Sequence, residues 1–328
     1  MEQSFAKEQT PRETVSKQET APKGILKFLY YTKCGAFFLK PITARWVSKV
    51  AGRYLDSRFS RHKIKGYVKK HRIDMSQYET ENYPSFNAFF TRRIRKELRP
   101  FDTAPEAFVA PCDGKLSLYP IADGARFNVK GFDYTAAELL KNAELAKKFE
   151  GGYCFVFRLC VEDYHRYFYF DDGMKSENTF IRGRLHTVQP AALGSRRVFT
   201  ENCREYTVIE TAHFGLAVQC EVGAMMVGRI VNYKGAGEVK RGEEKGKFEF
   251  GGSTIIVLTQ KGAVLPDEEF LKNTAASWKR RRSSPKRSTR SRSAAKRSRP
   301  ENGAWSDEGQ TQKISSAKPA VSVLCVSL

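Results

Sequence analysis

The sequence lacks several features that define common protein classes. It has no apolar run of about 18 residues, the length a membrane-spanning helix needs, and its first 22 residues are too polar for a secretory signal. Its seven cysteines are odd in number and include no CxxC pair, which argues against a zinc ribbon or a disulfide scaffold and favours a reducing compartment. No metal site is expected. The 328 residues suffice for one large domain or two small ones.

Acidic residues are nearly absent from two segments. Between residues 23 and 72, Asp56 is the only acid among 14 Lys and Arg, and residues 279–299 hold 11 Lys and Arg and no acid. The summed formal charge of these two segments exceeds the formal net charge of the whole chain, +21, so the remainder of the chain is slightly negative. The middle of the chain is therefore not a polyanion-binding surface by composition, and nucleic acid is not expected as its partner.

The composition divides the chain into four parts. Residues 1–22 predict a disordered leader, because they hold few large apolar side chains. Residues 23–104 mix aromatic and aliphatic clusters with Lys and Arg, which predicts short basic amphipathic helices, broken at Pro41, that associate with a membrane. A solvated charged face over a packed apolar stripe is the alternative for these helices. Residues 105–275 form the predicted catalytic β-rich domain.

The predicted fold class is α+β, with a mainly antiparallel β core, N-terminal amphipathic helices and a disordered basic tail. "TAAELLKNAELAKKF", residues 135–149, is the clearest helix pattern. Short segments rich in Val, Ile and aromatic residues, separated by Gly, Asp and Asn, predict strands. These segments are 153–160, 206–211, 216–233 and 253–260.

The last part, residues 276–328, contains "KRRRSSPKRSTRSRSAAKRSRP" and predicts a disordered Arg/Ser-rich tail. Three interpretations of this tail are open: an arginine–serine segment that binds RNA, a polybasic membrane segment, or a stretch translated out of frame.

Chemistry-bearing residues gather in short stretches. "APCDGKL" places Asp113 before Gly114 in a tight turn, and "EDYHRYFYFDDG" carries His165 among acids and arginine. "VGAMMVGRI" has two glycines where backbones can approach closely, and "RGEEKGKFEFGGST" ends on Ser253 and Thr254. Taken singly, each stretch is more typical of an ordinary turn or strand than of a site.

In their order along the chain, these stretches resemble the phosphatidylserine decarboxylase family. The family's aromatic–arginine signature is similar to "FFTRRIRKELRP", its Pro-x-Asp-Gly turn to "PCDGKL" and its Asp-Tyr-His-Arg segment to "DYHRYF". Its Gly-Ala-x-x-Val-Gly strand is similar to "GAMMVGRI", and its Gly-Ser-Thr ending to "RGEEKGKFEFGGST". The resemblance covers residues 24–275, and the leader and the basic tail lie outside it.

The resemblance implies that the chain cuts itself at the Gly252–Ser253 bond and converts Ser253 to a covalent pyruvoyl cofactor. It also implies Asp113 as the carboxylate that orients a base for Ser253. Many family members have a second histidine where this chain has Phe168, and phenylalanine cannot move a proton. Either His165 performs both proton transfers, or a second imidazole is needed, for which His186 is the best candidate; His213 is typical of a loop residue.

In turnover, the resemblance implies a decarboxylase that converts phosphatidylserine to phosphatidylethanolamine and CO2 at a membrane surface. His165 is expected to supply the proton, and Arg92 and Arg93 to bind substrate phosphate or carboxylate or to be surface arginines. The expected partners are an anionic phospholipid membrane on its cytoplasmic face (the cell membrane, if the chain is bacterial), a heterodimer of chains 1–252 and 253–328, and a homo-oligomer. The alternatives are a soluble amino-acid substrate or an uncleaved, non-catalytic relative that binds lipid or RNA.

Overall fold

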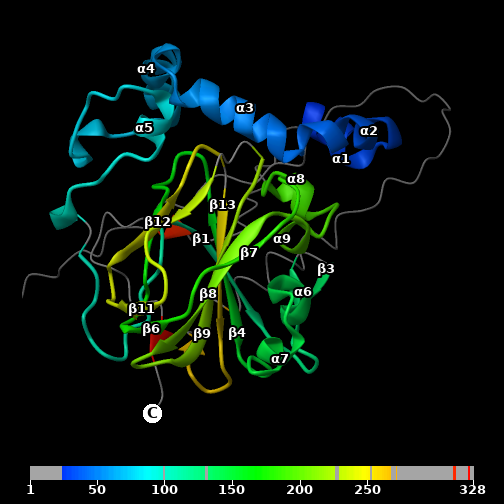
Figure 1. Cartoon of the computed structure of the whole chain (residues 1–328), viewed down its shortest axis with the longest axis vertical. Helices are drawn as coiled ribbons and strands as arrows, with labels where there is room; N and C mark the ends of the chain where they lie inside the picture. The colour runs from blue at the N-terminus through cyan, green and yellow to red at the C-terminus, as the bar shows by residue number, and fades with distance from the viewer. Residues whose placement is uncertain are drawn as a thin grey trace, which may run out of the picture.

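The computed structural model describes residues 24–98, 100–129, 132–225, 229–251 and 253–266, with Leu271 and the residue pairs 313–314 and 324–325. The predicted leader lies outside these residues, and so does the predicted tail apart from the two pairs. Around a central sheet, helices lie at one end and along one side (Figure 1). The predicted α+β class with an antiparallel core is confirmed.

The main sheet has nine strands, paired antiparallel in the order β11-β6-β8-β9-β13-β4-β1-β15, with β7 also on β8. Its strands are β1 (Gly114–Pro120), β4 (Tyr153–Leu159), β6 (Gly173–Lys175), β7 (Thr179–Ile181), β8 (Arg204–Thr211), β9 (Gly215–Val222), β11 (Gly237–Val239), β13 (Ser253–Thr259) and β15 (Lys313–Ile314). All seven residues of β13 are buried, because β13 lies between β4 and β9 and both of its faces are covered.

Smaller sheets complete the β structure. A three-stranded antiparallel sheet pairs β12 (Glu244–Phe248) with β10 (Ile230–Asn232) and with β5 (Arg166–Phe168). Two further pairs are β2 (Arg126–Val129) with β3 (Phe132–Thr135), and β14 (Leu265–Pro266) with β16 (Leu324–Cys325). The predicted strand over 216–233 is wrong as a single element: β9 ends at Val222 in the main sheet, and β10 begins at Ile230 in the other.

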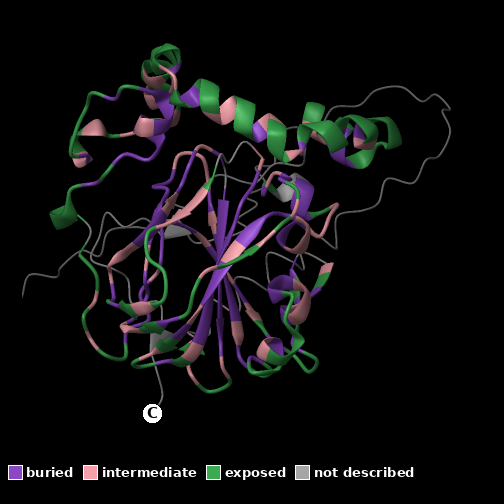
Figure 2. Ribbon diagram, viewed as in Figure 1, coloured by how far each residue is buried: buried purple, intermediate pink, exposed green. Residues whose placement is uncertain are grey.

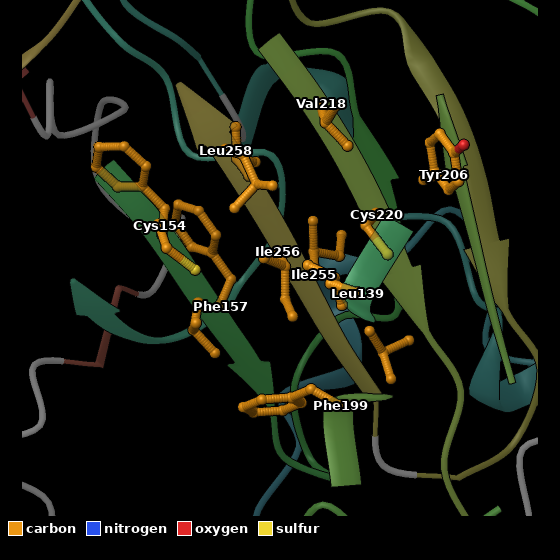
Figure 3. Packing of buried hydrophobic residues seen from close by; sticks show 14 of the residues in the cluster. Leu139, Cys154, Phe157, Phe199, Tyr206, Val218, Cys220, Ile255, Ile256 and Leu258 are labelled. Carbon is orange, nitrogen blue, oxygen red and sulfur yellow. The ribbon is translucent and has the colours of Figure 1, made fainter. Parts of the chain in front are cut away.

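The two faces of the main sheet follow from the alternation of side chains along each strand. Ile256 pairs with Cys220 and packs in the core near Leu139 and Phe199, on the helical side (Figure 3). The neighbouring Glu221 points to the opposite face, where Lys245 of β12 binds its carboxylate. The three-stranded sheet therefore covers the face opposite the helices.

The helix predicted over 135–149 is two helices, α6 (Ala136–Leu140) and α7 (Ala143–Lys147). The chain breaks because Lys141 adopts a left-handed conformation with φ 53° and the Asn142 side chain caps the next helix through the Leu145 amide. Two more short helices, α8 (Pro190–Leu193) and α9 (Val198–Glu201), lie on the same side of the sheet.

The N-terminal part is helical: α1 (Ile25–Tyr31), α2 (Lys33–Ile42), α3 (Arg45–Asp56), α4 (His62–His71) and α5 (Phe86–Phe90), with 3-10 turns η1 (Arg58–Arg61), η2 (Met75–Gln77) and η3 (Lys96–Leu98). Pro41, where a break was expected, lies inside the last turn of α2, and the helix ends one residue later at Ile42. In Figure 1 helix α3 lies across the end of the sheet where β13 begins. Among the described residues, no helix combines the length and apolar character that would let it cross a bilayer.

Helix α3 keeps apolar side chains exposed. Trp46, Val50 and Tyr54 recur every four residues, so they share one face, and each is more than two-fifths exposed. Basic residues lie beside them along the helix. In Figure 2 these helices are mostly exposed, whereas the strands below them are buried.

Candidate functional site

Ser253 is the first residue of β13 and follows the four-residue connection from β12. Its side chain is fully buried, and its hydroxyl oxygen has no hydrogen-bond partner among the described residues. A buried hydroxyl normally finds a partner, so this oxygen is a candidate for chemistry, although the hydroxyl of the neighbouring Thr254 also has no partner among these residues. Gly251, two residues earlier, has φ 137°, a conformation essentially restricted to glycine.

The ends of three neighbouring strands meet at Ser253. Ser253 pairs with Leu159, the last residue of β4, and on the other side of β4 the register places Gly114, the first residue of β1, at the same level. Asp113 therefore lies at the same end of the sheet as Ser253. The two are separated by two strand spacings, about 10 Å, since neighbouring strands are about 4.8 Å apart. A Cβ at position 114 would come within 2.9 Å of the Arg158 carbonyl oxygen, so only glycine fits there.

His165 lies beside the connection that leads to Ser253. It precedes β5, its carbonyl accepts the Phe248 amide at the end of β12 at 2.9 Å, and its ring contacts Phe90 at 4.2 Å between centroids. The Gly251 backbone is close enough to influence the pKa of the imidazole. The structure therefore brings His165 next to the segment that ends at the predicted cleavage bond.

The protonation state of His165 follows from its surroundings. Burial lowers the pKa of this fully buried imidazole to about 3, outweighing the contact with the Asp163 carbonyl, so the ring is neutral near pH 7. Its Nδ1 is 2.8 Å from the carbonyl oxygen of Asp163. A carbonyl only accepts, so Nδ1 carries the proton and the lone pair of the neutral ring lies on Nε2. Among the described residues Nε2 makes no well-formed hydrogen bond, although the Gly251 backbone lies close to the ring. A general base takes a proton with such a lone pair.

Two aspartates shape this end of the site. The Asp163 carboxylate accepts the Cys160 amide at 2.7 Å and closes the loop that presents His165. Burial raises the pKa of Tyr164 to about 12, and the charge of the Asp113 carboxylate is one of several smaller contributions. The group that orients the His165 ring in the structure is the backbone carbonyl of Asp163.

His186 has a different environment. Its Nδ1 is 3.4 Å from the Tyr30 hydroxyl of α1, and its Nε2 is 3.3 Å from a Glu201 carboxylate oxygen in α9. Among the described residues, no hydrogen bond or ion pair links His186 to Ser253. The other histidine that sequence inspection placed in a loop, His213, lies in the β8–β9 turn as expected, with Nδ1 2.8 Å from Asp171.

The two arginines expected at the site differ in burial. Arg92 is 1% exposed, and its guanidinium faces the rings of Tyr78 and Phe89 at 4.5 and 4.9 Å. Its hydrogen bonds go to the carbonyls of Phe89 and Glu162, and its Nε has no partner among the described residues. A buried cation with so few acceptors is costly, so Arg92 is suited to an anionic ligand. Arg93 is exposed.

Phe168, at the position where the resemblance implies a second histidine, is part of an apolar cluster. It packs with Tyr78, Ile94 and Tyr164, and its ring stacks on Tyr164 at 6.5 Å. Its amide donates to the Pro111 carbonyl at 2.8 Å, next to the "PCDGKL" turn. In this chain, position 168 therefore connects the Asp113 turn to the His165 strand through packing and a backbone bond.

Sequence inspection missed one residue that holds this site. This residue is Asn87, whose signal is the single polar residue inside "FNAFF", and which accepts the Phe250 amide at 3.0 Å. Arg166, the arginine of the Asp-Tyr-His-Arg stretch, donates from its guanidinium to the Thr91 carbonyl at 2.8 and 2.9 Å and pairs with Glu244. The Asp163 carbonyl could not have been found from sequence, because every residue carries one.

These features define a class of site: a buried serine that follows two glycines at a strand start, beside a neutral imidazole suited to activate a nucleophile. A family model described as phosphatidylserine decarboxylase matches residues 86–277. The "Phosphatidylserine decarboxylase proenzyme 2" of Clostridium acetobutylicum is 42% identical over 254 residues, covering 77% of this chain and 87% of that protein. Proteins of Fusobacterium nucleatum and Ruminiclostridium cellulolyticum, each named "Phosphatidylserine decarboxylase proenzyme", are 40% and 37% identical, with 79% and 78% of this chain and 89% and 88% of theirs covered.

The chain therefore belongs to the phosphatidylserine decarboxylase family. This confirms the recognition drawn from the motifs and the expectation of a decarboxylase.

Proposed function

We propose that this protein is a self-cleaving, pyruvoyl-dependent decarboxylase that converts phosphatidylserine to phosphatidylethanolamine and CO2 at a membrane surface. The observation that carries the proposal is the buried, unpartnered hydroxyl of Ser253 at the start of β13, beside the neutral His165 imidazole. The relatives' names, as proenzymes of phosphatidylserine decarboxylase, agree with it.

Self-cleavage begins when the Ser253 hydroxyl attacks the Gly252 carbonyl and passes its proton to a base. The C–N bond of Gly252–Ser253 breaks, an ester forms between Gly252 and the Ser253 oxygen, and the nitrogen of residue 253 becomes a free amine. Removal of the Cα proton then expels the Gly252 carboxylate from Cβ and leaves dehydroalanine. Water hydrolyses its imine tautomer to the ketone and releases ammonia, so residue 253 becomes the pyruvoyl group.

His165 is the base that the geometry favours for this cleavage. Its ring lies beside the 249–252 connection, where the Gly251 backbone reaches it, whereas the contacts of the His186 ring nitrogens are to Tyr30 and Glu201. In this proposal the His165 imidazole is the base in cleavage and the proton donor in turnover. A second histidine is then not needed at position 168, where this chain has Phe168. The Asp113 carboxylate, at the same end of the sheet, would act on the site through its negative charge.

Once formed, the pyruvoyl group at position 253 would supply an electron sink for loss of CO2. The residues around it fit such a group, because position 253 is buried, follows two glycines and faces no competing hydrogen-bond partner among the described residues. Arg92 would hold the anionic part of the substrate, with Arg93 at the exposed side. His165 would hold and return the proton that replaces the carboxylate.

The site's position also supports the proposed partners. The products 1–252 and 253–328 would remain a heterodimer, because β13 is hydrogen-bonded to both β4 and β9 in the middle of the sheet. The exposed face of α3, with Trp46, Val50 and Tyr54 beside basic residues, fits the interface of an anionic membrane near the site. This exposed face supports peripheral binding to a membrane, which we propose is on its cytoplasmic face.

Intact mass of the purified protein tests the proposal. We expect two chains, one ending at Gly252 and one beginning with a blocked former Ser253, and we expect Ser253→Ala to stay whole and to lose decarboxylation. A wild-type chain that stays whole and unmodified would overturn the enzyme proposal and favour the non-catalytic relative. Decarboxylation of free serine, but not of phosphatidylserine in vesicles, would favour the soluble substrate.

The role of each histidine is tested by comparing His165→Ala with His186→Ala. We expect His165→Ala to accumulate precursor, and His186→Ala to cleave at close to the wild-type rate. If His186→Ala accumulates precursor while its thermal stability is unchanged, His186 is the processing base and the assignment to His165 is wrong.

A further inference from the structure

The four residues between β12 and β13 carry the proposed cleavage bond, and side chains hold them at two points. The Glu249 carboxylate binds the Arg229 guanidinium at 2.7 and 3.1 Å, and the Glu249 amide donates to the Arg229 carbonyl at 3.1 Å. The Phe250 amide donates to the Asn87 side-chain oxygen at 3.0 Å. This second bond is the last side-chain anchor of the backbone before the two glycines.

Asn87 is built into α5 in a way that fixes its amide. The side chain is 6% exposed among aromatic neighbours, and its Nδ2 donates to the Asp56 carboxylate, the last residue of α3, at 2.8 Å. A backbone N–H on one side needs an acceptor and a carboxylate on the other needs a donor, so only one orientation of the amide satisfies both. Asp56 therefore keeps the Asn87 oxygen directed at Phe250.

The same short helix also contacts the imidazole. The Phe250 ring packs edge-on against Phe86 at 5.1 Å and Phe90 at 5.0 Å, and the Phe90 ring contacts His165 at 4.2 Å. Phe86 and Phe90 are four residues apart and share a helix face. One turn of helix thus sets the distance between the segment before the cleavage bond and the base beside it.

We propose, resting on the self-cleavage proposed above, that Asn87 is a positioning residue for that reaction, and that Asp56 acts through it. The Gly251–Gly252 pair has more backbone freedom than any other dipeptide, so its attack geometry depends on where the preceding residue is held. By holding the Phe250 amide, Asn87 presents the Gly252 carbonyl to the Ser253 hydroxyl. After the bond is cut, this restraint acts on a chain end and matters less.

The proposal predicts a specific pattern of rates when cleavage is followed by intact mass after synthesis of the full chain. Asn87→Ala removes the acceptor and should slow cleavage about tenfold, the effect of one hydrogen bond that sets a reacting geometry. Asn87→Asp keeps the acceptor but places a carboxylate against Asp56, so it should also slow cleavage. Adding Asp56→Asn to Asn87→Asp restores a donor opposite the new carboxylate and should return the rate to within about threefold of wild type.

Two further readouts separate positioning from a structural role. The material that has been cleaved should show a kcat per pyruvoyl group and a KM close to wild type, because the restraint acts on the intact bond. Asn142→Ala is the matched control: it removes the same kind of bond, from an asparagine side chain to the Leu145 amide, far from the site in α7. It should lower thermal stability slightly and leave the cleavage rate unchanged.

The inference fails if Asn87→Ala cleaves at the wild-type rate, or if Asn87→Asp with Asp56→Asn stays as slow as Asn87→Asp alone. It also fails if Asn142→Ala slows cleavage as much as Asn87→Ala does for the same loss of thermal stability. Should Asn87→Ala not fold, the comparison of Asn87→Asp with and without the exposed change Asp56→Asn still decides the question. Failure of the wild-type chain to cleave would instead reject the proposed function.

Discussion

The N-terminal helices and the main sheet use the same apolar residue types in opposite ways. In β4, β9 and β13 phenylalanine, isoleucine and valine are buried, as Phe157 and Ile256 show with 0% exposure. In the helices, Phe37 is 72% and Trp46 64% exposed, although each helix also places a few residues in a core cluster. The sheet is stabilised by what it buries, whereas the helices keep apolar area free for a partner.

Lysine shows the same contrast. Lys49 on α3 is exposed, whereas Lys245 on β12 is 0% exposed and is held by Glu221 at 2.8 Å and by the Asn232 side chain at 2.9 Å. Burial, only partly offset by Lys245, raises the pKa of Glu221. The exposed lysine charge on the helix can bind an anionic membrane surface, whereas the buried charge of Lys245 between the sheets is paired with Glu221.

The largest expected effect comes from breaking that pair. Lys245→Met leaves the buried Glu221 carboxylate without its cation and should lower the free energy of unfolding by about 3–5 kcal/mol. Lys49→Met, the same change on the exposed helix, should change it by less than about 0.5 kcal/mol. Denaturant unfolding in a Ser253→Ala background, which compares single chains, measures both. Adding Glu221→Gln to Lys245→Met should recover part of the loss; no recovery would contradict a charge-based cause.

A phenylalanine pair tests the apolar contrast. Phe157→Ala opens a cavity between the sheets and should cost about 3–5 kcal/mol of unfolding free energy. Phe37→Ala should leave unfolding nearly unchanged but lower the affinity for anionic phospholipid vesicles by about tenfold or more, because a buried phenylalanine contributes about 1.5–3 kcal/mol. Vesicle cosedimentation and denaturant unfolding read the two effects separately. Equal stability losses in both variants would mean that the helices are part of the core.

A further comparison is the slope of stability with pH. The folded pKa of His165, about 3, lies below the ordinary value of 6.5, so the unfolded chain binds the additional proton in that window. Stability is therefore fully present above about pH 6.5 and is lost as pH falls toward 3, by about 1.4 kcal/mol per pH unit from this group.

His165→Gln should flatten this slope relative to its parent, whereas His62→Gln, on the exposed α4, should keep it. Urea unfolding between pH 4 and pH 7 in the Ser253→Ala background makes the comparison. Identical slopes for the parent and His165→Gln would contradict a neutral, buried His165.

Several features could be predicted from local sequence because they depend on local chemistry. Segments rich in Val, Ile and aromatic residues predicted β4, β8 and β13, the Gly-Gly-Ser-Thr segment placed a strand start at Ser253, and the order of motifs identified the family. The break between α6 and α7 was missed, because a left-handed lysine leaves no sign in an apolar pattern that continues across it. The division of 216–233 between two sheets was missed for a similar reason, since both halves have strand composition.

The residue types at the site, the family and the separation of basic segments from the rest of the chain can all be taken from the sequence. Which groups meet at the site depends on the folded structure. The Asp163 carbonyl sets the tautomer of His165, burial keeps that ring neutral, and Asn87, more than 160 residues before Phe250, holds the backbone next to the proposed cleavage bond. These relations depend on distance and solvent exclusion, which arise when segments far apart in the chain pack together, and no local pattern encodes them.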